Sequence, residues 1–154
     1  MMKKKLKPNI IKKNMVYKNI FLDTNILVDI VTNRHPFSKN AISIFDYCQK
    51  SNTKMYSTSH SIATLHYLVK KIVDEKELRL IIEDLLDTIS IIGVTESILK
   101  KSLKSKHKDF EAAIQIVSAQ SINNMDCIVT RDLKDYKFAE ISVLTPDDFL
   151  NTIE

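Results

Sequence analysis

Short apolar runs alternate with longer segments of helical periodicity along most of the chain. The short runs are rich in β-branched residues and bounded by polar ones, which is typical of strands. The expected strands are residues 19–23, 54–58, 89–94, 126–130 and 141–144. The expected helices, with apolar residues at three- and four-residue steps, are residues 25–32, 38–50, 60–73, 75–87, 96–104 and 109–123. This alternation predicts a three-layer α/β/α fold around a central, mostly parallel sheet of about five strands.

The first and fourth expected strands indicate that both faces of the sheet are covered. Their segments IFL (20–22) and CIV (127–129) are apolar at every position, as is usual for strands buried between two helical layers. Sheets of this type bind ligands beyond the carboxyl ends of their strands. Polar residues that directly follow a strand are therefore the first candidates for a functional site.

Two helix starts have a local cause. Ser38 is expected to cap the helix at 38–50 by accepting a backbone N–H with its side-chain oxygen. The run Thr145-Pro146-Asp147-Asp148 combines a cap, a proline and early acids, which predicts a C-terminal helix. The chain has one glycine and no flexible linker, so residues 15–154 are expected to form a single domain.

The net charge of +4 at pH 7 is concentrated at the N-terminus. Residues 1–14 hold six of the 23 basic residues and no acid, which leaves 17 basic and 19 acidic residues elsewhere. We expect residues 1–14 to be a disordered tail that either binds phosphate backbones or has no function. No apolar run approaches the roughly 18 residues of a membrane span. Cys48 and Cys127 match no zinc-binding spacing and are expected to be buried free thiols of a cytoplasmic protein.

The first expected strand ends in Asp23-Thr24-Asn25. Asp23 would place its carboxylate at the rim of the sheet, where it can bind a hard cation. Thr24 and Asn25 would offer a hydroxyl and an amide group beside it. The same tripeptide is typical of a helix-capping turn, and taken alone it favours that interpretation.

Further carboxylates are expected at the same edge. Asp132 and Asp135 follow the fourth expected strand, and Asp109 and Glu111 open the helix that precedes it. Taken singly, they indicate polar turns or stabilisation of a helix dipole. Gathered together, they would suit Mg²⁺ or Mn²⁺, which prefer oxygen ligands and can activate water and neutralise phosphate charge. The joint pattern therefore favours a metal site.

Several segments, taken in order, resemble the PIN domain family in the branch of the VapC-type toxins. They are IFLDTNILVDI with the trailing RHPF, SIATLHYLVKK, DFEAAIQIVSAQ, CIVTRDLKDY and VLTPDDFL, and they cover nearly all of residues 18–150. The resemblance implies a Rossmann-like parallel sheet and hydrolysis of RNA phosphodiester bonds with Mg²⁺ or Mn²⁺. It also implies a homodimer and, for many members, neutralisation by a small antitoxin protein.

The resemblance assigns roles to individual residues. Asp23 matches the family's first metal-binding acid, Asp132 the acid or amide after the fourth strand, and Asp135 the acid three residues later. Thr130 matches a small hydroxyl residue beside the site. Two positions depart from the pattern: Thr64 stands where Glu is common, and the helix that opens at 109 has alanine where Asp is usual.

That alanine, Ala112, leaves two hypotheses. Asp109 lies one turn earlier on the same helix face, and Glu111 is offset by roughly 100° but has a longer side chain. A site with Asp23, Asp109 and Asp132 as catalytic acids, and with Glu111 as a further metal ligand, would be a weakened ribonuclease. The alternative is a degenerate PIN domain that binds RNA or an antitoxin without cleaving.

A short basic and aromatic segment follows the first expected helix. Arg34 is expected to contact RNA phosphates, and His35 and Phe37 extend the segment. Aromatic and guanidinium planes can stack bases of single-stranded RNA, although the core is the simpler place for Phe37. Arg131 is a second candidate for contacts with the RNA backbone.

The expected helix at 60–73 carries other polar and aromatic residues. His60 and His66 would face different directions and are interpreted as structural residues. Tyr67 is expected to be a core or groove aromatic. Lys70 and Lys71 could contact a phosphate backbone, or could simply be solvated.

Three other α/β classes conflict with the sequence. Haloacid-dehalogenase-like phosphatases need a second Asp two residues after the first, where this chain has Asn25. Receiver domains need an early acidic pair and a suitably placed later Lys. Nucleotide-binding folds need glycine-rich loops, and the chain has a single glycine, Gly93.

Overall fold

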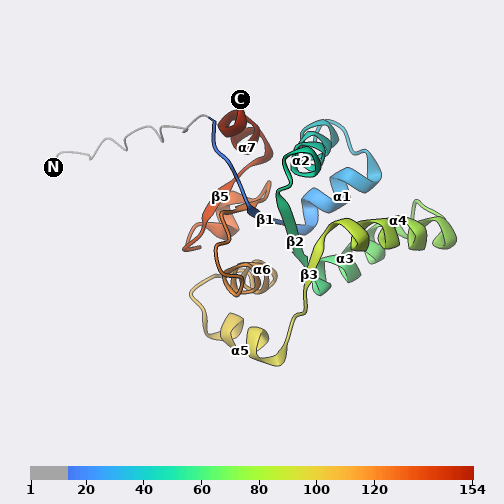
Figure 1. Ribbon diagram of the computed structural model, residues 1–154. Helices are drawn as coiled ribbons and strands as arrows, with labels where there is room; N and C mark the ends of the chain where they lie inside the picture. The colour runs from blue at the N-terminus through green and yellow to red at the C-terminus, as the bar shows by residue number, and fades with distance from the viewer. Residues whose placement is uncertain (1–13) are drawn as a thin grey trace.

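The computed structural model describes residues 14–154, in which strands and helices alternate along the chain (Figure 1). The strands are β1 (Asn19–Leu22), β2 (Lys54–Thr58), β3 (Ser90–Ile92), β4 (Cys127–Val129) and β5 (Ser142–Leu144). The helices are α1 (Thr24–Thr32), α2 (Ser38–Ser51), α3 (Ser59–Val69), α4 (Glu75–Thr88), α5 (Glu96–Lys104), α6 (Phe110–Gln120), α7 (Pro146–Ile153) and the 3₁₀ helix η1 (Leu133–Tyr136). All strand pairs are parallel, in the order β3-β2-β1-β4-β5. The α/β prediction is confirmed. The expected basic tail lies outside the described residues, apart from Asn14.

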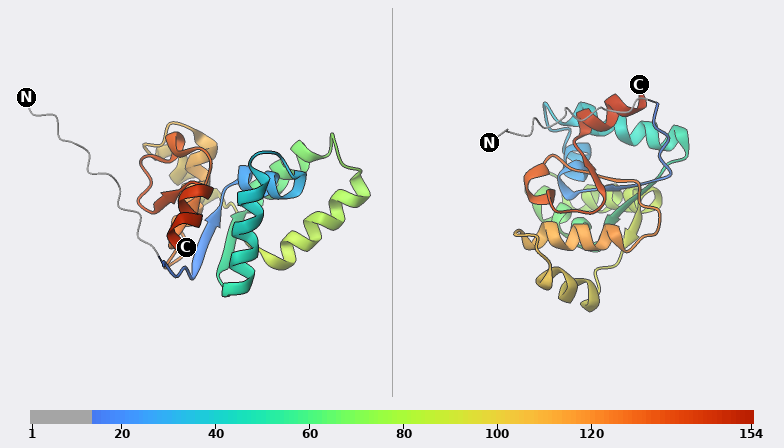
Figure 2. Two further views of the ribbon diagram at one scale, coloured as in Figure 1. Left: turned by 90° about the horizontal axis from the view of Figure 1, so that it is seen from above. Right: turned by 90° about the vertical axis from the view of Figure 1, so that its left-hand side faces the viewer.

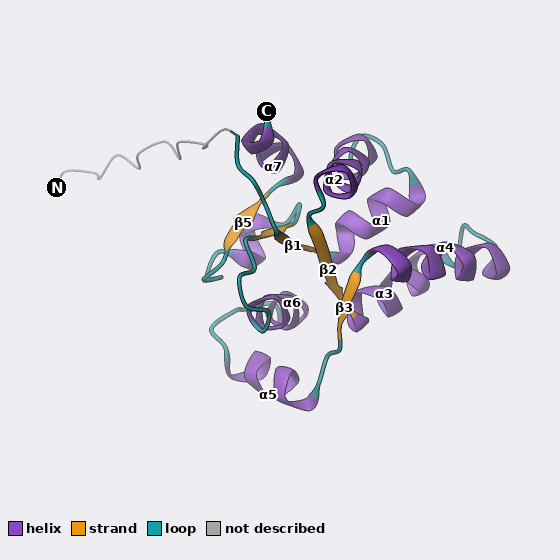
Figure 3. Ribbon diagram, in the orientation of Figure 1, coloured by secondary structure: helices purple, strands orange, loops and turns teal. Residues whose placement is uncertain are grey.

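Helices cover both faces of the sheet (Figure 3). Because side chains alternate along a strand, Ile20 and Leu22 of β1 face one layer while Phe21 faces the other. The first layer buries apolar residues of α1, α2, α3, α4 and α7, among them Leu27 and Phe149. The second layer buries those of α5, α6 and η1. Two apolar cores therefore hold the central strands rigidly between them.

The register of the central strands determines which residues leave the sheet together. Leu22 of β1 lies opposite Val129 of β4. Asp23 and Thr130 therefore leave the sheet side by side, and the backbone N–H of Asp23 still donates to the carbonyl of Val129 at 3.0 Å. Thr58, at the end of neighbouring β2, lies at the same edge.

Several local predictions can be compared with the structure. The cap of α7 is confirmed, because the Thr145 hydroxyl accepts the N–H of Asp148 at 3.1 Å. The cap predicted at Ser38 is wrong: Phe37 is already in the helical region before it, so Ser38 is the first helical residue and makes no capping bond. Cys48 and Cys127 are free and buried, as expected.

The hairpin of α3 and α4 extends from one side of the sheet (Figure 2). The helix expected at 60–73 ends at Val69, earlier than predicted. The chain turns there so that α4, which is capped by Asp74, runs back along α3. Ile72, which had extended the apolar pattern, is 71% exposed in this turn. In residues 14–154 no helix is long and apolar enough to cross a membrane.

Candidate active site

Asp23 lies where β1 ends and α1 begins. Its backbone is extended, and one carboxylate oxygen, Oδ1, accepts the N–H of Thr24 at 2.7 Å, so that Asp23 caps α1. Asp23 therefore caps α1, as the tripeptide suggests, and its role as a metal-binding acid stays a prediction. Only 8% of Asp23 is exposed, so the rest of its hydrogen bonding must come from neighbouring protein groups.

Those neighbours come from elements far apart in the sequence. The Thr130 hydroxyl donates to Oδ2 of Asp23 at 2.7 Å, and the Asn25 amide approaches the same oxygen at 3.4 Å. The Gln115 amide of α6 donates to Oδ1 at 3.2 Å. With Thr24, four donors approach the roughly four lone-pair positions of one carboxylate. Asp23 is held in a fixed orientation by neutral groups.

Gln115 is the residue of this site that the sequence did not reveal. It is 2% exposed, and its amide nitrogen also donates to the Ser61 hydroxyl at 2.6 Å. Its amide oxygen accepts the Thr58 hydroxyl at 2.7 Å. The only sequence signal was a glutamine on the buried side of an otherwise apolar helix. Buried amides require partners, so such a residue indicates a polar network.

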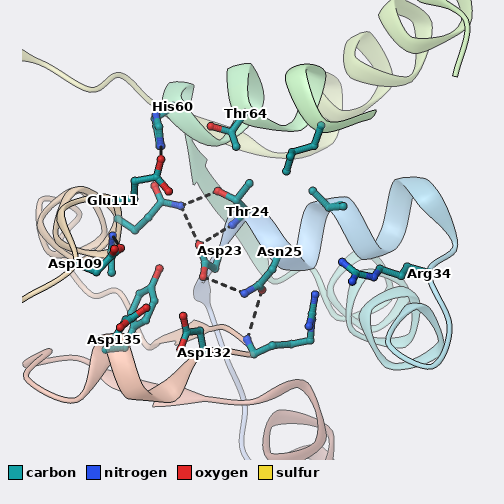
Figure 4. Close-up of a pocket in the computed structure, with 16 residues that line it drawn as sticks. Asp23, Thr24, Asn25, Arg34, His60, Thr64, Asp109, Glu111, Asp132 and Asp135 are labelled. Atoms are coloured by element: carbon teal, nitrogen blue, oxygen red, sulfur yellow. Dashed lines mark hydrogen bonds and ion pairs between the residues drawn. The ribbon is translucent and has the colours of Figure 1, made fainter. Parts of the chain in front are cut away.

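Asp132 and Asp135 lie on the other side of Asp23, in and beside η1 (Figure 4). The backbone N–H of Asp132 donates to the Thr130 hydroxyl at 3.1 Å, which ties this turn to Asp23. A hydrogen bond with Asp132, and repulsion by its charge, raise the pKa of the Asp135 carboxyl above its usual value. The carboxyl of Asp135 therefore lies within reach of Asp132 at the edge of the pocket.

The acids at the start of α6 have partners of their own. Asp109 caps the helix, and its Oδ2 accepts the N–H of Ala112 at 2.9 Å. Glu111 is well exposed and lies 3.6 Å from His60 of α3. Ala112 is 4% exposed and places a methyl group in the pocket wall, where the expected Asp is missing. Thr64 lines the opposite wall.

These residues surround one open pocket of about 260 Å³ at the carboxyl edge of the sheet (Figure 4). It is lined by the five acids Asp23, Asp109, Glu111, Asp132 and Asp135, and by the cationic side chains of Arg34 and Arg131. Buried Tyr136 forms part of the wall. Burial, then the charge of Asp23 and hydrogen bonding to it, and the charges of Asp132 and Asp109, raise the pKa of this phenol. With five acidic side chains and two arginines in its lining, the pocket is predominantly acidic.

Comparison with known proteins identifies this arrangement. A model of the PIN domain matches residues 19–134. The chain belongs to the PIN domain family. This PIN domain is 25% identical over 137 residues to Ribonuclease VapC1 of Aquifex aeolicus (strain VF5), a match that covers 86% of this chain and 93% of that protein.

Solved structures resemble this PIN domain over most of its length. A toxin–antitoxin complex from Klebsiella pneumoniae matches 82% of this chain and 97% of that chain, with a TM-score of 0.63 and 24% identity. VapBC2 from Rickettsia felis, bound to a promoter DNA fragment, matches 82% of this chain and 98% of that chain, with a TM-score of 0.63 and 18% identity. At these identities the likeness establishes the fold.

PIN nucleases typically depend on a divalent metal, and the acids of this pocket can be compared with the ligands that such an ion takes. Within residues 14–154, no three His, Cys, Asp or Glu side chains come close enough together to hold an ion. Mg²⁺, however, keeps several waters and takes only one or two carboxylates. The all-oxygen donors of the pocket fit such a hydrated ion, and they do not fit one enclosed by protein. One or two of the carboxylates of Asp23, Asp132 and Asp135 would hold it, and water would fill the remaining positions.

Arg131 connects this acidic pocket to a neighbouring aromatic residue. The carboxylate of fully buried Asp29 accepts two hydrogen bonds from Arg131, one from Nε at 2.7 Å and one from Nη2 at 3.2 Å. This pair of bonds fixes the plane of the guanidinium group. That plane lies 3.9 Å from the ring centre of Phe37. Phe37 is 37% exposed, so the expectation that it packs in the core is wrong: its ring stacks on Arg131 at the surface.

The other residues singled out on α3 lie at its surface. Tyr67 is 57% exposed, with the ammonium groups of Lys70 and Lys71 about 5 Å above its ring, so it is not a core aromatic. His66 bonds to Glu75 of α4, whereas His60 faces the pocket, so the two histidines do face different directions.

Proposed function

We propose that this PIN domain is a divalent-metal-assisted ribonuclease and the toxin of a toxin–antitoxin pair. One observation carries the proposal: five carboxylates from separate segments converge on one pocket at the carboxyl edge of the sheet. An acidic pocket repels a phosphodiester unless a cation lies between the two. The similarity to Ribonuclease VapC1 supports RNA as the substrate.

The residues of the chain would divide the work as follows. A divalent ion in this pocket would neutralise phosphate charge and activate water. Asp23, fixed by Thr24, Gln115 and Thr130, would present its carboxylate without further reorientation. Arg34 would bind a phosphate oxygen. Asp132 and Asp135, which follow β4, would hold the ion from the other side of the pocket.

Cleavage of RNA with added Mn²⁺ tests the proposal. We expect Asp23→Asn and Asp132→Asn to lower the rate on the order of 100-fold, since each removes a metal-binding charge. Asp87→Asn, an exposed acid of α4, is the matched control and should cleave like the wild type. Equal cleavage by all four proteins would exclude the metal mechanism.

A specific observation favours a second candidate, a PIN domain that binds RNA or an antitoxin without cleaving. Ala112 removes one acid, and the oxygens of Asp23 already accept bonds from neutral donors. A metal ion that bound Asp23 would compete with these donors, of which the Asn25 amide at 3.4 Å is the most distant. RNA binding by the wild type, with no cleavage at any metal concentration, would establish this candidate instead.

The antitoxin belongs to the proposal because the similar solved structures are toxin–antitoxin complexes. A small open reading frame adjacent to the gene, whose product co-purifies with this chain and suppresses its cleavage, would support it. A protein that cleaves RNA but has no such neighbour would instead act as a nuclease outside any such pair. The homodimer stays a prediction, which light scattering of the purified chain can test.

A further inference from the structure

Four lysines lie together on a surface beside the acidic pocket, and none of them has a role in the proposed reaction or was singled out from the sequence. Lys106 and Lys108 lie between α5 and α6, and Lys134 and Lys137 lie in and after η1. Lys108, Lys134 and Lys137 line a small hollow together with Asp135 and Phe138. We call these four lysines and Phe138 the basic patch. Asp135 lines both this hollow and the acidic pocket, so the two surfaces are continuous.

The lysines of the basic patch are available to a ligand. All four are exposed. Within residues 14–154, the ion pairs involve other residues, so no carboxylate is bonded to any of these four ammonium groups. Four unpaired positive charges on one surface attract a polyanion. The patch also stands out because residues 15–154 carry more acids than bases.

Phe138 gives the basic patch an aromatic component. It is 42% exposed, and the ammonium groups of Lys106 and Lys137 lie 5.9 and 5.0 Å from its ring centre. Alternating cations and aromatic rings are the usual means of binding single strands, since cations contact phosphates while rings stack on unpaired bases. In a duplex the bases stack on one another, so an exposed aromatic side chain such as Phe138 has no free base to stack on.

The basic patch and the arginines lie on opposite sides of the acidic pocket. In Figure 4, Asp135, which borders the patch, and Arg34 lie on opposite sides of Asp23. Arg34 lies 5.8 Å from the ring centre of Phe37, on which Arg131 stacks at 3.9 Å, so the second group of cations and an aromatic ring is on the side of Arg34. A strand that touched both sides would have to cross the carboxylates between them.

We propose that the basic patch binds the backbone of single-stranded RNA and, with Arg34, directs the strand across the acidic pocket. This inference rests on the proposed function for its substrate, and it adds where the strand lies on either side of the reacting phosphate. The acidic pocket and the basic patch then have separate roles: one holds the cation and the other supplies the affinity.

Binding without cleavage tests the inference. The probe is a labelled oligouridylate of about 12 nucleotides, in EDTA, titrated at several salt concentrations. The test variant replaces Lys108, Lys134 and Lys137 with Gln. The matched control replaces Lys18, Lys50 and Lys54, three exposed lysines at the opposite, amino-terminal edge of the sheet, of which Lys54 also lies over an aromatic ring.

We expect the patch variant to bind about tenfold more weakly or worse at moderate salt, and its salt dependence to fall by up to about 2 in logarithmic slope, near 0.7 per lost phosphate contact. The control should bind like the wild type. Equal weakening of both variants would mean that only net charge matters, and would overturn the inference.

Unchanged binding by the patch variant would also overturn it, and would leave the basic patch to another partner such as an acidic protein segment. Failure of the proposed function looks different. In that case the wild type binds the oligonucleotide through the patch but does not cleave RNA when Mn²⁺ is added.

Discussion

Replacing Gln115 with methionine tests the network that fixes Asp23. Methionine has a similar length and fits a buried helical position, but it makes no comparable hydrogen bonds. The change removes the donor to Asp23 at 3.2 Å, the donor to Ser61 at 2.6 Å and the acceptor for Thr58 at 2.7 Å. All these groups lie where water cannot easily replace the lost partner.

The expected loss follows from these three bonds. A hydrogen bond to a charged group contributes about 1.5–3 kcal/mol and a neutral one about 0.5–1.5 kcal/mol, so the free energy of unfolding should fall by about 2.5–6 kcal/mol. For a chain of this size that corresponds to a decrease in Tm of roughly 5–24 °C. Thermal and urea unfolding measure both quantities.

Gln120→Met provides the control, because Gln120 is exposed at the end of the same helix. It should change stability by no more than about 0.5 kcal/mol. If both variants were equally stable, the Gln115 network would contribute nothing and the reasoning would be refuted.

Gln115→Glu separates the charge from the packing. It keeps an acceptor for Thr58 but places a second carboxylate against Asp23. The repulsion raises the pKa of the new carboxyl in the folded state, so stability should be lost as the pH rises through its titration. A destabilisation independent of pH would mean that the introduced carboxyl does not face the charge of Asp23.

Three further predictions follow from the same structure. Ala112→Asp restores an acid to the pocket wall, so it should lower stability in EDTA by about 1–3 kcal/mol, and saturating Mn²⁺ should offset that loss in thermal unfolding and increase RNA cleavage. Asp135→Asn removes a carboxyl whose pKa is raised by Asp132; a raised folded pKa means that ionisation opposes folding, so the variant should be more stable than the wild type at pH 7 and equal to it well below the usual Asp pKa of 3.8. Burial raises the pKa of the Cys48 thiol to about 12 and also raises the pKa of the Cys127 thiol. At pH 8 both thiols should therefore react with a thiol reagent only as fast as the chain unfolds.

The fold was predictable because it depends on periodicity. The apolar segments around Ile20 and Cys127 gave the parallel sheet, and the rule on carboxyl ends placed attention on Asp23 and Asp132. Boundaries were less predictable. Ser38 has the sequence of a cap but lies one residue inside its helix, because the preceding turn already brings Phe37 into helical geometry.

Part of the network around Asp23 was expected, since Thr130 was placed beside the site by the resemblance and its hydroxyl does bond to Asp23. The part made by Ser61 and Gln115 was not predictable, because these residues share no local pattern and only the packing of α3 and α6 against the end of β1 brings them together. The position of Phe37 was also not predictable from its local sequence. An aromatic residue after a helix suggests the core, but Arg131, fixed from below by Asp29, offers its ring a flat partner at the surface.

The acids of the pocket differ in what surrounds them, and this difference indicates where a cation would bind. Asp23 is surrounded by neutral donors, Asp109 caps α6, and Glu111 faces His60. Asp135 instead has a raised pKa, because of a hydrogen bond with Asp132 and repulsion by its charge. A divalent ion would relieve most repulsion at this pair, which also borders the basic patch. If metal binding follows that repulsion, Asp135→Asn should weaken Mn²⁺ binding more than Glu111→Gln does, and the reverse order would place the ion at the α6 side.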